Sequence, residues 1–175
     1  MTSMKSGRDE KGQSLVEFAV SAIVILLLLV AIADFGRAFF TYLTIRDAAQ
    51  EGAVYGSVCP MHVAGIENRI RAASSGTVDL SPSSPITWSC RYVYDTDNDG
   101  DIDDDDTLPF CSSIYHPNPT YLPVPGHGIR IEVVYPDFPI TTPLLGSIIG
   151  QSITLTAQVT DTILVLGNAP PDPCP

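Results

Sequence analysis

Residues 12–58, GQSLVEFAVSAIVILLLLVAIADFGRAFFTYLTIRDAAQEGAVYGSV, decide the fold of this chain. The apolar run within them covers residues 18–33, contains Ser21 as its only polar residue, and follows Leu15 and Val16. At about 1.5 Å per helical residue, this run approaches the roughly 30 Å hydrocarbon core of a bilayer, although about 20 residues are usual. The sequence therefore predicts a short but adequate membrane-spanning helix.

The same helix is predicted to continue as a stalk to residue 58, before the Cys59-Pro60 pair ends it. Beyond the apolar run, aromatic and small residues recur at spacings of three and four, which places them on one helix face. The small residues permit close approach of a sheet or a neighbouring helix. The predicted face consists of Phe35, Ala38, Phe39, Tyr42, Ile45, Ala49, Gly52, Ala53 and Gly56.

Glu17 stands at the start of the apolar surface, where an ionisable group is costly and indicates a function. Gly12 is followed by Gln13 and, four residues later, by Glu17 and Phe18. This arrangement resembles the processing site of type IV prepilins. The resemblance implies that a prepilin peptidase cuts after Gly12, that the mature chain begins at Gln13, and that Glu17 neutralises the N-terminal amine of a neighbouring subunit.

The segment as a whole resembles the N-terminal signature of TadE-like proteins, the pseudopilins of the tight-adherence (Flp) pilus apparatus. A second likeness to the family lies in GIRIEVVYPDFPITTPLLGSIIGQSITLTAQVT near the other end, whereas the middle and the ending PPDPCP depart from it. The N-terminal matching positions are Gly12, Glu17, Phe18, Asp34, Gly36, Arg37, Ala48, Ala49, Glu51, Gly52 and Ala53.

The resemblance implies a membrane-anchored minor pilin or assembly factor whose partners are the membrane, other pilin subunits, the pilus assembly platform and the peptidase. Residues 1–12 would be a cytoplasmic leader, residues 13–58 the transmembrane and stalk helix, and residues 59–175 an extracytoplasmic head. Lys5, Arg8 and Lys11 independently favour a cytoplasmic N-terminus in a single-pass protein. An ordinary secretory signal cut after Ala33 is the rival interpretation, and it would release a soluble domain beginning at Asp34.

The formal net charge of −11 is concentrated in one stretch, since eight aspartates lie within residues 95–106. A chain with so little basic character is not expected to bind nucleic acid. The stretch DTDNDGDIDDDD has the spacing of an EF-hand-like calcium loop, with Gly100 at the sharp turn. Its final Asp, in place of the usual Glu, resembles dockerin-type loops. The predicted metal ligands are Asp95, Asp97, Asp99, Asp101, Asp103 and Asp106.

A structural calcium ion is the cofactor that this spacing predicts. The alternative is a solvated acidic loop without a metal. A strand, and no helix, is expected to lead into the stretch, so a sensor that opens on binding is not expected.

The four cysteines lie outside the predicted membrane span, and their even number in an oxidising compartment favours two disulfides. Three connectivities are open from sequence. We prefer Cys90 with Cys111, which would close the base of the acidic loop, and therefore Cys59 with Cys174.

Strands are predicted at residues 86–94, 128–135 and 151–160, and a short helix at residues 62–73. Residues 109–127 are proline-rich and are expected to be irregular. In the first strand, Trp88, Cys90, Tyr92 and Tyr94 should share one face. The predicted fold class is therefore α+β and pilin-like, with a long helix packed on a small antiparallel sheet.

No pattern of catalytic residues accompanies His62, His116 or His127, which are interpreted as surface histidines. We expect neither an enzyme nor a small-molecule substrate. The alternative to a pilus protein is a calcium-dependent adhesive or binding module, either secreted or anchored by an uncleaved helix.

Overall fold

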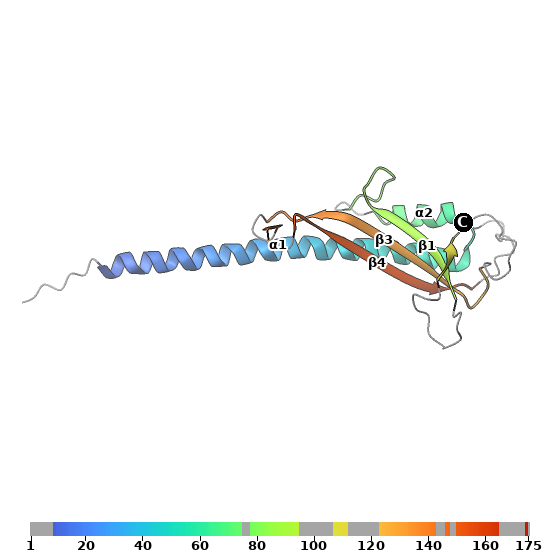
Figure 1. Cartoon of the computed structure of the whole chain (residues 1–175), viewed down its shortest axis with the longest axis horizontal. Coiled ribbons are helices and arrows are strands. Elements are labelled where there is room, and N and C mark those ends of the chain that lie inside the picture. The colour runs from blue at the N-terminus through green and yellow to red at the C-terminus, as the bar shows by residue number, and fades with distance from the viewer. Residues whose placement is uncertain are drawn as a thin grey trace, which may run out of the picture.

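A long helix carries a small α+β head at its C-terminal end in the computed structural model (Figure 1). The structure describes residues 9–74, 78–94, 107–111, 123–142, 146–147, 150–164 and 174. Helix α1 (Asp9–Val58) projects away from the head over its first half and packs against the head over its second half. The predicted fold class, a long helix on a small antiparallel sheet, is confirmed.

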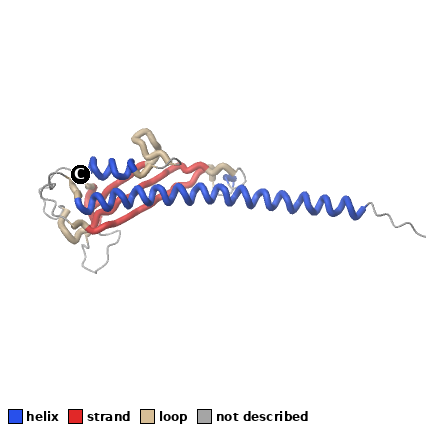
Figure 2. Tube along the Cα trace, turned by 180° about the vertical axis from the view of Figure 1, so that it is seen from behind, coloured by secondary structure: helices blue, strands red, loops and turns tan. Residues whose placement is uncertain are grey.

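Both helices lie on the same face of the sheet, so the head has two layers (Figure 2). Helix α1 ends at Val58 because Pro60 cannot continue it. Helix α2 (Val63–Ala72) follows after a short turn, close to the predicted range. Its apolar side chains Ile66 and Ile70 are buried against the rest of the head.

The sheet has the order β2-β1-β3-β4, and every pair of neighbouring strands is antiparallel. Strands β1 (Thr87–Val93), β3 (Gly128–Pro139) and β4 (Ser152–Thr162) correspond to the three predicted strands. Strand β2 (Thr107–Phe110) was not predicted, because Pro109 argues against a strand. Its place at the sheet edge explains how a proline is accommodated, since one side of an edge strand needs no ladder hydrogen bonds.

Strand β3 also extends beyond its predicted end at Tyr135, as far as Pro139. The register shifts between Tyr135 and Phe138, which takes Pro136 out of the ladder and lets the pairing with β4 resume at Phe138. This extension carries the β3–β4 end of the sheet toward the apolar half of α1 (Figure 1).

The core forms where α1, α2 and the inner face of the sheet meet. Small residues on α1 let the backbone approach closely, since a Cβ added at Gly56 would lie 2.5 Å from Ile129 Cδ1. Cys90 and Tyr92, which were predicted to share a strand face, are both buried in the core, whereas Tyr94, predicted on the same face, is exposed. The largest fully buried side chains are Ile45, Ile66, Ile70, Ile129, Ile131, Ile163, Val93 and Val133.

The head covers only part of the predicted face of α1. Ile45, Ala49, Gly52, Ala53 and Gly56 are buried, which agrees with the predicted close approach at the small residues. Phe35, Phe39 and Tyr42, predicted on the same face, are exposed. In these turns the buried positions are Asp34 and Thr41, which continue the spacing of Ile45 and Ala48 toward the apolar run. The hydrophobic periodicity did not reveal this line of buried residues, because its first two members, Asp34 and Thr41, are polar.

Candidate functional site

The projecting half of α1 is long and apolar enough to cross a membrane. Among the described residues, one helix, at Gly12–Val58, meets that criterion; its most apolar window has a mean hydropathy of 3.0, and none of that window is buried. A core helix of a soluble protein would be mostly buried, so this helix needs another apolar environment. A single-pass membrane anchor is the assignment that follows.

The predicted processing residues all lie on this exposed half. Gly12, Gln13, Glu17 and Phe18 are exposed, and nothing lies within 4 Å of a Cβ added at Gly12. Helix α1 is described from Asp9 onward, so it includes the predicted leader boundary at Gly12. Cleavage after Gly12 and the role of Glu17 remain predictions.

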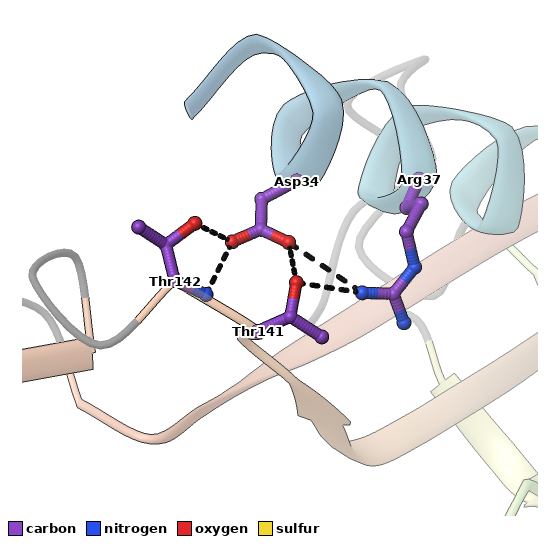
Figure 3. A network of polar contacts seen from close by, with 4 residues as sticks. All are labelled: Asp34, Arg37, Thr141 and Thr142. Atoms are coloured by element: carbon purple, nitrogen blue, oxygen red, sulfur yellow. Dashed lines mark hydrogen bonds and ion pairs between the residues drawn. The ribbon is translucent and has the colours of Figure 1, made fainter. Parts of the chain in front are cut away.

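A cluster of four polar residues joins α1 to the segment after β3, directly beyond the apolar run (Figure 3). The hydroxyls of Thr141 and Thr142 both donate to the Asp34 carboxylate, and the Thr142 N–H donates to Asp34 Oδ2 at 2.7 Å. Arg37 Nη1 lies 3.2 Å from Thr141 Oγ1 and 3.5 Å from Asp34 Oδ1. We call these four residues the polar clasp.

The clasp holds an ionised carboxylate in a nearly buried position, since Asp34 is 7% exposed. Hydrogen bonds from the Thr141 side chain, and then from Thr142, lower the pKa of Asp34 to about 2. The cluster thus supplies hydrogen-bond donors to both oxygens of the carboxylate, and it fixes the membrane end of the head to α1. From sequence, Asp34 was only a position matching a family, because its partners lie 107 and 108 residues away.

Asp34→Asn is expected to loosen the clasp at neutral pH and much less in acid. Because the folded pKa lies below the ordinary 3.8, the carboxylate contributes stability above about pH 4 and loses it between about pH 4 and pH 2. Hydrogen exchange at the Thr142 amide measures this directly, and exchange should be faster in the variant at pH 7. The control is Asp47→Asn, at an exposed position of the same helix. Equal Thr142 exchange in wild type and Asp34→Asn at pH 7 would refute the role assigned to the carboxylate.

Two disulfides are present, and they are the two pairs preferred from sequence. Cys59 and Cys174 are joined with a Cα–Cα distance of 6.1 Å, and Cys90 and Cys111 with one of 5.3 Å. The first attaches the C-terminal tail to the end of α1. The second links β1 to the end of β2, where the Cys111 N–H also donates to the Cys90 carbonyl.

The predicted calcium ligands Asp95, Asp97, Asp99, Asp101, Asp103 and Asp106 lie outside the described residues. The strands on either side of them are described, and Val93 is paired with Thr107. The residues that flank the acidic stretch are therefore adjacent. In the part of the chain that the structure describes, no group of three or more His, Cys, Asp or Glu side chains lies together.

The histidines differ in their surroundings. His62 is exposed and its Nδ1 lies 2.7 Å from the Tyr55 hydroxyl. His127 is half-buried, with its ring centroid 4.3 Å from that of Tyr94, so the surface interpretation is wrong for it. Its Nδ1 has no hydrogen-bond partner among the described residues, and burial lowers its pKa. His116 lies outside the described residues.

Fold and site together define a protein with a candidate membrane helix, a stalk and a disulfide-linked α+β head. Residues 12–54 match the model of the family described as TadE-like protein. The predicted resemblance to that family is confirmed over this segment, which contains Gly12, Glu17, Phe18, Asp34 and Arg37. No curated protein and no solved structure matches the chain.

Proposed function

We propose that this protein is a TadE-like pseudopilin, a minor pilin or assembly factor of a tight-adherence (Flp-type) pilus. The proposal rests on one observation: the residues that match the family lie entirely within α1. Residues 12–54 run from the start of the exposed apolar half to the small residues packed in the head. The TadE-like family is a family of pilus components, which accords with a role that is not enzymatic.

In this proposal α1 works by packing. Its exposed apolar half lies in the bilayer, with the N-terminus in the cytoplasm, and packs beside other pilin helices. A prepilin peptidase removes residues 1–12, and the free amine of Gln13 on one subunit is then neutralised by Glu17 of another. The polar clasp keeps the head fixed to α1 just outside the apolar segment, so that the head and the helix move together.

Glu17→Gln tests this role in cells that lack the native gene. The variant keeps the shape of the side chain but cannot neutralise an amine, so pilus assembly should be lost while the protein stays in the membrane fraction. The matched control is Glu51→Gln, an exposed glutamate on the head half of the same helix, which should assemble normally. Normal piliation in the strain without the gene would refute the proposed function.

A calcium-binding head is a second proposal, favoured by the pairing of Val93 with Thr107. This pairing and the Cys90–Cys111 bridge hold together the two strands that flank residues 95–106, as a loop that wraps a cation requires. Carboxylates at such density would repel each other without a counterion.

Isothermal titration of the full chain in detergent should show calcium binding. The signal should disappear in the Asp95→Ala, Asp99→Ala double variant and persist in Asp137→Asn, at an exposed position of β3. Absence of binding by the wild type would leave an acidic loop without a metal.

A further inference from the structure

Three phenylalanines lie exposed on α1 immediately beyond the apolar run. Phe35, Phe39 and Phe40 are 72%, 48% and 65% exposed. Their rings contact one another along the helix, with centroids 6.3 Å apart for Phe35 and Phe39 and 6.2 Å apart for Phe39 and Phe40. We call these three residues the aromatic collar. Exposed apolar area of this kind marks a contact with a partner or a membrane.

The position of the collar along α1 favours a lipid partner. At 1.5 Å per residue, residues 15–33 span about 28 Å, close to the thickness of a hydrocarbon core. The collar begins two residues later and therefore falls at the level of the lipid headgroups. Phenylalanine rings on a helix can bury themselves at the boundary between headgroups and acyl chains, as they do on helices that lie at a membrane interface.

The charges on this part of α1 fit the same environment. Asp34 is almost inaccessible inside the polar clasp, and the next acid along the helix is the exposed Asp47, about 21 Å beyond Ala33. Arg37, whose side chain is about half exposed, is the charged group that accompanies the collar. A cation with an apolar stem suits the headgroup layer, since it can reach lipid phosphates.

An apolar groove of about 310 Å³ opens beside the collar, between α1 and the β3–β4 end of the sheet. The groove begins at Ala31, inside the apolar run, so it is continuous with the surface that the bilayer covers. Asp34 also borders it, but both carboxylate oxygens are occupied by the clasp. The apolar residues that line it are Ala31, Phe35, Ala38, Phe138, Ile140 and Ile153.

We propose that the aromatic collar and this groove form a lipid-contacting surface, with the collar in the headgroup layer and a lipid chain in the groove. The head then rests on the bilayer, and the polar clasp shields the Asp34 carboxylate, which would otherwise face lipid. This inference depends on the membrane anchor of the proposed function, but not on its role in a pilus.

Depth-dependent quenching of tryptophan fluorescence by brominated lipids tests it. Full-length Phe39→Trp and, separately, Phe35→Trp are reconstituted in vesicles at a high lipid-to-protein ratio. Lipids brominated near the headgroup should quench both variants more strongly than lipids brominated near the chain ends. Trp88, the one native tryptophan, lies in the head, and the unsubstituted protein supplies its background.

Two control positions on α1 separate this inference from the anchor. Leu26→Trp, within the apolar run, should be quenched most by deep bromine, and Val54→Trp, exposed on the head half, should not be quenched. Deep quenching at Leu26 without quenching at Phe39 or Phe35 would overturn the lipid surface while the anchor stands, leaving a protein partner as the occupant. Absence of quenching at Leu26 would overturn both the anchor and the surface.

Discussion

Replacing Cys59 and Cys174 with alanine is expected to lower the free energy of unfolding of the full chain by about 4 kcal/mol. The bridge joins residues separated by 115 positions, and a loop of about 100 residues corresponds to nearly 5 kcal/mol in the chain-entropy model. Measured losses in small domains are about 2–5 kcal/mol, a large part of the roughly 5–15 kcal/mol that stabilises a typical domain. Urea unfolding in detergent, followed by Trp88 fluorescence, measures the change.

The second bridge provides the matched comparison. Cys90 and Cys111 are separated by 21 positions, for which the same model gives about 3 kcal/mol, so their replacement by alanine should cost less. A loss below about 1 kcal/mol for the Cys59 and Cys174 variant would show that the tail contributes little to the head.

Gly52→Val is expected to destabilise the head by about 1–3 kcal/mol. An added Cβ at Gly52 would lie 2.6 Å from Ile70 Cγ1 and 3.5 Å from Ile131 Cγ2. These atoms belong to two fully packed side chains, one on α2 and one on β3. Valine would therefore separate α1 from both layers, and the loss can be read from the same urea transitions.

Gly36→Val is the control for this prediction, since it makes the same change in the same helix. Nothing lies within 4 Å of a Cβ added at Gly36, so its stability should stay within about 0.5 kcal/mol of wild type. Equal losses at the two positions would mean that close packing against Ile70 does not determine the effect.

The parts of the fold that sequence predicted are those with a strong local signal. A hydrophobic pattern of their own marks three of these parts: the apolar run, the pair Ile66 and Ile70, and the alternation of β4. A helix-breaking proline in Cys59-Pro60 marks the end of α1. Strand β2 was missed because four residues with a proline depend on an edge position that only the assembled sheet provides. The extension of β3 was missed because its register shift lets a proline stand within a strand.

The polar clasp could not be predicted for a similar reason. Asp34 and Arg37 have a helical spacing, but Thr141 and Thr142 meet them only after the sheet has folded onto α1. Periodicity placed Phe35, Phe39 and Tyr42 on one helix face with the small residues, but it does not show how much of that face the head covers. The acidic stretch had the clearest motif, and its ligation of calcium remains a prediction.

The mature N-terminus of the protein from its native membrane, determined by mass spectrometry, tests the proposed function most directly. Processing after Gly12 would leave Gln13 as the first residue, with Glu17 at the start of an apolar helix that is retained. This is the result expected for a TadE-like pseudopilin. A chain that begins at Asp34 would contradict it, because the anchor would have been removed as a secretory signal and a soluble head released.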